Sequence, residues 1–404
     1  MKRRTFLQTV AVPVLAPWAL RSTGPKKIAA LSTTYHVRSH SDNFITRFLE
    51  GYWINERYYR PPCDIVSLFV DQIHPADISR RLSMAYGFKI YSSIADALTL
   101  GTGKLAVDGV LLIGEHGDYP TNSKLQKLYP RYEFMQQVVE VFRSSGRAVP
   151  VFVDKHLSYD WRQARWMYDQ SRELGFPLMA GSSVSVTFRR PELDFPLGTH
   201  FEEALEIGGG WVADGGIFHN LEVLQCFVER RRGGETGVRA VQHVEGDAVW
   251  HAANEGRWSR ELMEAALARG QKVVPGRPGE LVKNPVACFL EYNDGLKATI
   301  LMLGGMVSEY LAAFRVKGGS DILSTLCYIP RENSNNFSPL VDSIARTFIS
   351  GKTDYPVERT LLTTGALAFL MESRYQGHTR IETPMLNIAY QAPVKSYYAH
   401  GPGS

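Results

Sequence analysis

The sequence is poor in cysteine and in net charge, and each shortage excludes a class of protein. The four cysteines stand far apart in the chain, at positions 63, 226, 288 and 327. Without a CxxC pair, neither a zinc site nor a redox dithiol is predicted. The formal net charge is only +4 over 404 residues, and beyond the N-terminus the longest basic run is Arg230–Arg232. A nucleic-acid-binding protein concentrates positive charge on one face, so no nucleic-acid partner is expected.

A second absence falls after the first predicted strand, residues 27–31. The stretch 32–41 reads Ser-Thr-Thr-Tyr-His-Val-Arg-Ser-His-Ser and contains no glycine. Folds that bind dinucleotides need glycines here, because backbone N–H groups must approach the pyrophosphate at a helix N-terminus. The side chains of Tyr35, His36 and Arg38 would crowd a phosphate held in that way. The usual dinucleotide cradle is therefore not predicted.

The N-terminus has the composition of an export signal. Met1–Arg4 is basic, and the apolar stretch 10–20 that follows is too short to span a bilayer comfortably. The pair Arg3-Arg4 resembles the twin-arginine class of signals. We therefore predict that residues 1–25 are a twin-arginine-type signal peptide, that the protein is exported to the periplasm, and that the twin-arginine export machinery is a partner.

Residues 26–183 alternate short apolar runs with segments of helical spacing. Strands are predicted at 27–31, 64–70, 89–91, 109–113, 149–153 and 177–180, and helices at 44–53, 76–86, 94–100, 131–144 and 161–174. Strands that alternate with helices at this spacing indicate a Rossmann-like, doubly wound parallel sheet. Because all its strands end at the same edge, a functional site is expected along that edge.

After about residue 185 strands follow one another without helices between them. They are predicted at 240–249, 287–292, 297–303 and 312–317, with a hairpin turn at 293–295. This order indicates an α+β domain with a large, mainly antiparallel sheet, at 184–355, that binds substrate and mediates oligomerisation. A helix at 361–375 begins a C-terminal segment, 356–404, that returns to the first domain. A homo-oligomer is expected, formed through an exposed face of the large sheet.

Three stretches place chemistry-bearing residues in a recognisable order. Asp71 closes the second strand, Asp154-Lys155-His156 follows the fifth, and the glycine-rich stretch 208–222 contains Asp214, His219 and Glu222. This order resembles the glucose–fructose oxidoreductase/inositol dehydrogenase (Gfo/Idh/MocA) family over nearly the whole of the chain after the signal peptide. The chain departs from the family pattern at three points. Asp154 replaces a glutamate, His156 replaces a proline whose peptide bond is often cis, and one residue is inserted between Asp214 and His219.

The resemblance implies an oxidoreductase that passes hydride from a sugar or polyol to NAD or NADP, although the missing glycines weaken this inference. His219 would be the general acid or base, Lys155 would polarise the same hydroxyl, and Asp214 would orient the substrate or His219. The residues implied for the cofactor are Asp71, Glu115, His116 and Lys155, and those expected to bind the small carbohydrate substrate are Trp211, Glu222 and His156.

Two further interpretations stay open. On the same fold, a sugar-processing lyase, hydrolase or isomerase could use Lys155 and His219 after losing dinucleotide binding. A non-catalytic carbohydrate-binding protein would leave those two residues without a role.

No metal site is predicted, but the ligating groups of Glu115-His116-Gly117-Asp118, with His74 or His156, do not exclude one. The path of residues 31–44 distinguishes the oxidoreductase from the non-redox enzyme, because a loop that fills the pyrophosphate position would exclude dinucleotide redox chemistry.

Aromatic residues are dense in an insertion between the first and second strands. They are Tyr52, Trp53, Tyr58 and Tyr59. Such rings either pack into the core or present a flat face on which a sugar can stack. The sequence leaves both alternatives open.

Overall fold

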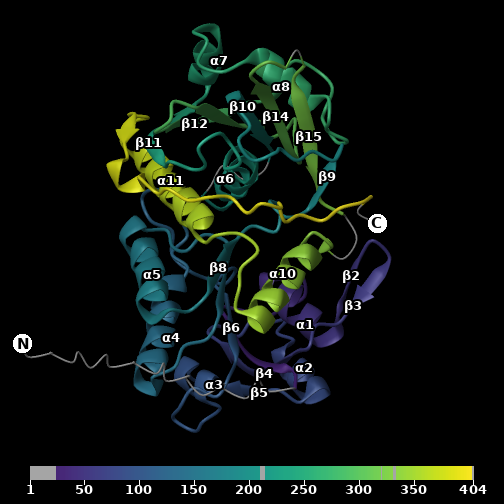
Figure 1. The fold of residues 1–404 in the computed structure, drawn as a ribbon, viewed down its shortest axis with the longest axis vertical. Coiled ribbons are helices and arrows are strands. Elements are labelled where there is room, and N and C mark those ends of the chain that lie inside the picture. The colour runs from purple at the N-terminus through teal and green to yellow at the C-terminus, as the bar shows by residue number, and fades with distance from the viewer. Residues whose placement is uncertain (1–23, 210–213, 320, 331–333, 403–404) are drawn as a thin grey trace, which may run out of the picture.

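Two β-sheets follow one another along the long axis of the molecule (Figure 1). The computed structural model describes residues 24–209, 214–319, 321–330 and 334–402. Most of the predicted signal peptide and Trp211 lie outside these ranges, so export to the periplasm stays a prediction. Within the described ranges, no helix combines the length and apolarity that crossing a membrane requires.

The first sheet has six strands, all parallel. They are β1 (Lys26–Ser32), β4 (Cys63–Val70), β5 (Lys89–Tyr91), β6 (Gly109–Ile113), β7 (Val151–Asp154) and β8 (Leu178–Gly181). Their spatial order is β5-β4-β1-β6-β7-β8, so the direction of winding reverses between β1 and β6. This order confirms the predicted doubly wound sheet. The reversal is the point at which such folds bind ligands at the carboxyl edge.

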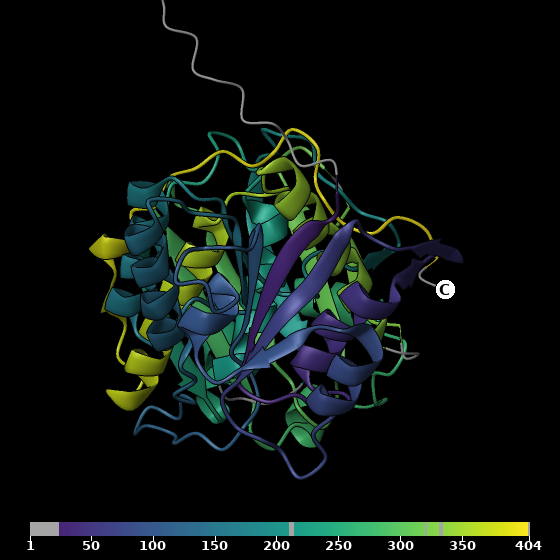
Figure 2. The same ribbon diagram turned by 90° about the horizontal axis from the view of Figure 1, so that it is seen from below.

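Helices cover both faces of this sheet, as Figure 2 shows from below. One face carries α3 (Ile94–Thr99), α4 (Arg131–Ser145) and α5 (Trp161–Leu174), and the other carries η1 (Asp42–Thr46), α1 (Arg47–Glu50), α2 (Ser79–Tyr86) and α10 (Phe337–Ser350). Burial on both faces explains why β6 is apolar and buried at every position. Although α10 lies within the range 184–355, its apolar side packs onto the first sheet.

The predicted helix over 44–53 ends early, at Gly51. Gly51 has φ of +84°, and a Cβ atom there would lie 2.3 Å from the Tyr58 hydroxyl oxygen. The chain then forms a hairpin from β2 (Tyr52–Ile54) and β3 (Arg57–Tyr59). The aromatic residues of this insertion divide between the two predicted alternatives, because Tyr52 is buried while Trp53 and Tyr58 are exposed.

The second sheet has eight strands. They are β9 (Phe188–Arg190), β10 (Phe201–Gly208), β11 (Val238–Glu245), β12 (Val286–Tyr292), β13 (Lys297–Met302), β14 (Tyr310–Val316), β15 (Leu323–Tyr328) and β16 (Ile381–Glu382). The order is β16-β11-β12-β13-β10-β14-β15-β9, and β10 with β13 is its parallel pair. A mainly antiparallel sheet is thus confirmed. The predicted strand 240–249 is wrong at its end, because the chain turns at Gly246, with φ of +67°, into α7 (Asp247–Asn254).

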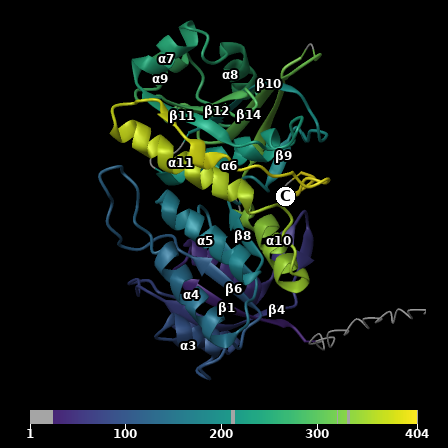
Figure 3. The same ribbon diagram turned by 60° about the vertical axis from the view of Figure 1, so that its left-hand side comes forward.

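Helices lie on both faces of the second sheet as well. The face toward the first domain carries α6 (Asp214–Val228) and α11 (Glu358–Tyr375), and the opposite face carries α7, α8 (Arg260–Leu267) and the short α9 (Pro278–Leu281). Figure 3 shows α11 running between the two sheets, where it contacts both α6 and α5. Strand residues beneath α8, such as Leu205 and Leu311, are fully buried. The face expected to pair subunits is therefore covered at α8, and a homo-oligomer stays a prediction.

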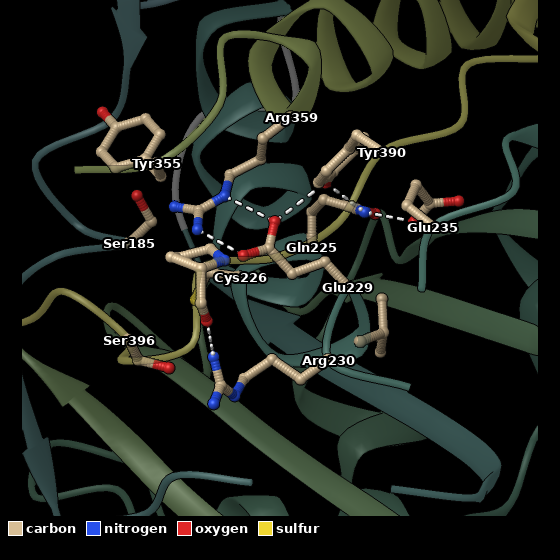
Figure 4. A network of polar contacts seen from close by, with 12 residues as sticks. Ser185, Gln225, Cys226, Glu229, Arg230, Glu235, Tyr355, Arg359, Tyr390 and Ser396 are labelled. Carbon is tan, nitrogen blue, oxygen red and sulfur yellow. Dashed lines mark hydrogen bonds and ion pairs between the residues drawn. The ribbon is translucent and has the colours of Figure 1, made fainter. Parts of the chain in front are cut away.

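A buried polar network joins α6, α11 and the C-terminal segment (Figure 4). Arg359 donates from Nε to Glu229 Oε2 at 2.8 Å and from Nη2 to Glu229 Oε1 at 2.5 Å. The Tyr390 hydroxyl donates to Glu229 Oε2 at 2.8 Å and accepts from the Gln225 amide at 2.9 Å. Because all four side chains are buried, each polar group depends on the others for its hydrogen bonds.

Candidate active site

A cavity of about 640 Å³ lies where the carboxyl edge of the first sheet meets α6 of the second domain. Five predicted site residues line it: Glu115, Lys155, His156, Asp214 and His219. The lining also includes Thr121, Leu125, Lys127, Tyr129, Asn220, Met302 and Tyr310. The structure thus brings Lys155 and His219 to a single cavity, from the end of β7 and from α6 respectively.

Lys155 is presented by an unusual backbone turn. Its φ is +67°, and its N–H donates to the Gly181 carbonyl, at the end of β8, at 3.2 Å. A non-glycine residue in this region costs about 1–3 kcal/mol, which the surrounding structure must offset. The cis peptide bond of the described residues is Arg190–Pro191, so the bond before His156 is not cis. The left-handed backbone conformation of Lys155 itself therefore sets the direction of its side chain, and no cis peptide bond at the next position is needed.

Glu115 links the cations of the site. Lys155 Nζ donates to Glu115 Oε1 at 2.8 Å, and Arg131 Nη2 donates to Oε2 at 2.6 Å. Burial alone would raise the pKa of the Glu115 carboxyl, but Lys155 and Arg131 hold it well below its usual range. Arg131 is fully buried, and its Nη1 also donates to His156 Nε2 at 3.0 Å. One carboxylate thus organises the base of the cavity.

His219 is placed to exchange a proton with a ligand. Its Nδ1 lies 2.6 Å from the Ser182 hydroxyl oxygen, just beyond β8. Burial, with the charges of Lys155 and His40, lowers the pKa of the imidazole well below its usual value. Its Nε2 makes no hydrogen bond with any described residue. The ring is therefore neutral near pH 7, with one nitrogen held by the protein and the other available.

Asp214 contacts the backbone rather than His219. Its Oδ1 accepts from the Gly215 N–H at 2.7 Å, and its Oδ2 accepts from the Lys127 N–H at 3.2 Å. Burial raises the pKa of its carboxyl. The residue thus joins the start of α6 to the loop between β6 and α4, both of which line the cavity.

Three other predicted residues lie outside the cavity lining. Glu222 is fully buried and accepts from the Thr363 hydroxyl at 2.6 Å, so its carboxylate connects α6 to α11. Asp71 is exposed at the end of β4, where it accepts from the Tyr119 hydroxyl at 2.5 Å. His116 has φ of +69°, and burial together with His40 lowers its pKa to about 4. The predicted stacking residue Trp211 is outside the described residues.

The sequence placed His116 with His74, but it did not reveal that His36 and His40 join them in a histidine cluster at the sheet edge. The rings of His36 and His74 stack at 4.1 Å between centroids, and those of His40 and His116 lie 5.2 Å apart. His40 Nδ1 lies 2.6 Å from Asp154 Oδ2. The four-residue spacing of His36 and His40 in the glycine-free stretch was the available signal. Within the described part of the chain, no three histidine, cysteine or acidic side chains are arranged to hold a metal ion.

The start of the first helix does not fit a dinucleotide pyrophosphate. The Ser39 hydroxyl accepts from the Asp42 N–H at 3.2 Å, and the Asp42 carboxylate accepts from the Arg38 N–H at 2.9 Å. These contacts satisfy N–H groups that would otherwise face a phosphate. Asp42 also places a negative charge in the first helical turn, where it would repel the pyrophosphate.

The loop before this helix follows the sheet edge that a dinucleotide would use. The Thr33 N–H donates to the Ile113 carbonyl at 3.1 Å, and the Thr33 carbonyl accepts from the Gln72 N–H at 2.9 Å, so the chain continues between β4 and β6. Further on, the His40 side chain reaches Asp154 at the end of β7. The loop therefore contacts the segment after β4, where the Tyr35 carbonyl accepts from the Ile78 N–H, and the helix that follows it reaches the end of β7 through His40. The residues present do not fit a dinucleotide in its usual position.

Two buried imidazoles predict a loss of stability in mild acid. Burial first, and then neighbouring cations, lower the pKa of His156 well below its usual value, and burial with His378 lowers that of His243 to about 3. Both rings are neutral when folded, whereas the unfolded chain takes up protons near pH 6.5. The contribution of each ring to the free energy of unfolding is thus complete above about pH 6.5. Below this pH it decreases by about 1.4 kcal/mol per pH unit until the pKa of the folded state is reached.

Urea unfolding at pH 7.5 and pH 5.5 measures this loss. His243→Gln should lose less stability than the wild type between pH 7.5 and pH 5.5, whereas buried carboxyls such as Glu206, whose raised pKa acts in the opposite direction, contribute equally to both proteins. An equal change of stability in the two proteins would contradict the prediction.

Comparison with known proteins supports the fold. No protein-family model matches the chain, and no curated protein sequence matches it. A myo-inositol 2-dehydrogenase from Lactobacillus plantarum superposes with a TM-score of 0.51 at 10% identity, covering 89% of this chain and 99% of that one. GenD2 from gentamicin A biosynthesis, in complex with NAD, gives 0.53 at 12% identity, covering 91% and 99%. A Gfo/Idh/MocA family oxidoreductase from Vibrio cholerae gives 0.50 at 13% identity, covering 87% and 97%.

The chain therefore has the two-domain fold of these dehydrogenases and oxidoreductases. The resemblance predicted from its motifs is confirmed at the level of the fold, over most of the chain. At such identities the comparison establishes the architecture alone.

Proposed function

We propose that this protein is an acid–base enzyme that acts on a small polyhydroxylated molecule, a sugar or a polyol, without a dinucleotide. The observation that carries the proposal is the shared cavity of Lys155 and His219, where an ammonium group and an imidazole of lowered pKa meet. A volume of about 640 Å³ is within the range of small-molecule sites.

The two residues have complementary tasks in this proposal. His219, neutral near pH 7, accepts a proton from a substrate hydroxyl, or from a carbon next to a carbonyl group, and returns it later. The Lys155 ammonium group donates hydrogen bonds to the oxygen on which negative charge develops. Glu115 holds this ammonium group in position, and Ser182 fixes the ring of His219 through Nδ1. Proton transfer of this kind underlies isomerisation and elimination reactions of sugars.

A nicotinamide-dependent sugar oxidoreductase is the second candidate. The fold favours it, because the NAD complex of GenD2 and the inositol dehydrogenase share the architecture of this chain. The capped helix start and the contact between His40 and Asp154 count against it. The same Lys155 and His219 would serve both reactions, so the two candidates differ in whether a hydride acceptor takes part.

One experiment separates the two candidates, whichever product is formed. Purified protein is incubated in D₂O with a panel of aldoses, ketoses, polyols and sugar acids, and the substrate C–H signals are followed by NMR. Parallel samples contain NAD or NADP, and the absorbance of the reduced nicotinamide is recorded. We expect deuterium incorporation or a new product without dinucleotide, and its loss in His219→Asn.

The remaining outcomes decide against the proposal. Turnover that requires added NAD or NADP, or a nucleotide released from the purified protein, would support the oxidoreductase instead. Equal turnover of the wild type and His219→Asn would reject the assigned role of His219.

A further inference from the structure

One cation of the cavity wall has no partner among the described residues. Lys127 lies in the loop between β6 and α4, half-buried, and lines the cavity. Its ammonium group makes no hydrogen bond or ion pair with any described residue. Lys124, three residues earlier, forms an ion pair with Glu372 instead. The charge of Lys127 is therefore available to a ligand.

The loop that carries Lys127 is held in place by backbone contacts. The Lys127 N–H donates to Asp214 Oδ2 at 3.2 Å, and Lys127 forms a β-bridge with Thr121 across the loop. The Gln126 amide donates to the Tyr159 carbonyl at 2.8 Å. The Cα of Lys127 is thus anchored to α6, although its side chain is not paired within the described chain.

The acidic groups of the cavity do not neutralise its cations. Both oxygens of Glu115 are already shared by Lys155 and Arg131. Both oxygens of Asp214 accept backbone N–H groups. Among the described residues, Lys155 and the buried Arg131 therefore share the charge of Glu115, and Lys127 is the lining cation without an ion pair.

A buried donor in the same wall also lacks a partner. Because Arg131 can only donate, His156 Nε2 accepts, and a neutral ring must then carry its proton on Nδ1. His156 is 2% exposed, and its Nδ1 makes no hydrogen bond among the described residues. An unpaired buried N–H is costly, so the described residues leave one polar group unsatisfied beside the cavity.

We propose that the substrate of this cavity carries an anionic group, a carboxylate or a phosphate ester, and that Lys127 binds it. What happens to the substrate in this inference rests on the proposed function, but the binding of an anion by Lys127 does not. Lys127 determines specificity in this assignment, whereas Lys155 and His219 act on the reacting carbon and oxygen. The unpaired charge of Lys127 would attract such a ligand most strongly at low ionic strength.

Binding of matched probes tests the assignment independently of turnover. D-glucose, D-glucuronate, D-gluconate and D-glucose 6-phosphate are titrated into the wild type, Lys127→Gln and the control Lys124→Gln by calorimetry. We expect at least one anion to bind about tenfold more tightly than glucose, and this preference to disappear in Lys127→Gln and persist in Lys124→Gln. The affinities for D-glucuronate and D-gluconate, which carry a carboxylate, are compared with the affinity for D-glucose 6-phosphate. This comparison shows which of the two anionic groups the cavity prefers.

Two results would overturn the inference. One is that the wild type binds the anionic probes no more tightly than D-glucose, or does not bind any of them. The other is an unchanged preference in a Lys127→Gln variant whose thermal unfolding matches that of the wild type. Anion binding without proton exchange in D₂O would instead reject only the proposed function, while turnover of neutral sugars alone would reject only this inference.

Discussion

Lys155→Met is expected to lower turnover by about two to four orders of magnitude, because the substrate oxygen would lose its cationic hydrogen-bond donor. Methionine keeps most of the length and apolar volume of the lysine stem, so the cavity wall stays filled. Arg131 still pairs with Glu115 in the variant, through the hydrogen bond to Oε2. The fold should therefore survive, and the loss should appear in kcat.

The control for this variant is Lys104→Met. Lys104 is exposed and donates to the Ser144 carbonyl, away from the cavity. Steady-state kinetics on the substrate identified by the deuterium experiment should show wild-type turnover for Lys104→Met. A Lys155→Met enzyme that retains turnover within a factor of about three would remove Lys155 from the mechanism.

Arg359→Met is expected to lower the free energy of unfolding by about 3–5 kcal/mol, since it leaves the Glu229 carboxylate buried without its cation. Both side chains are almost inaccessible to water, and two hydrogen bonds join them in the network of Figure 4. The Tyr390 hydroxyl would remain the one donor to Glu229 from this network. Urea unfolding at neutral pH measures the loss.

An exposed ion pair provides the matched control. Arg165 and Asp169 are joined at 2.8 Å, with about half of each side chain exposed (49% and 48%). Arg165→Met should change stability by less than about 1 kcal/mol, because water already solvates both charges. The double variant Arg359→Met/Glu229→Met should recover part of the loss by removing the unpaired carboxylate. A loss below about 1 kcal/mol in Arg359→Met would show that Glu229 finds another partner.

The first sheet could be predicted because both its faces are covered. Burial on two faces requires continuous apolar runs, and strands such as Gly109–Ile113 are visible in the sequence for that reason. Strand β10 could not be found in the same way, because Glu202, Glu203 and Glu206 interrupt its apolar pattern. Glu206 is nevertheless fully buried, without a hydrogen-bond partner among the described residues, and burial raises the pKa of its carboxyl well above the usual range.

The candidate site could be predicted in part from the order of its motifs. Lys155 and His219 were found because each follows a recognisable pattern, and the structure places both at one cavity. Glu222 shares the helix of His219 but lies three residues further on, where the side chain meets α11. Lys127 carries no motif, and its place in the cavity depends on a loop that α6 holds through Asp214.

The amino-acid sequence by itself determined the alternation of strands and helices, and therefore the parallel sheet and the edge at which its loops gather. It also determined that no glycine cradle for a phosphate follows β1. Only the tertiary structure decided where the glycine-free loop goes, since His40 meets Asp154 across 114 residues of chain. Local periodicity reports burial within one element, whereas contacts between distant segments depend on how the two sheets and their helices pack.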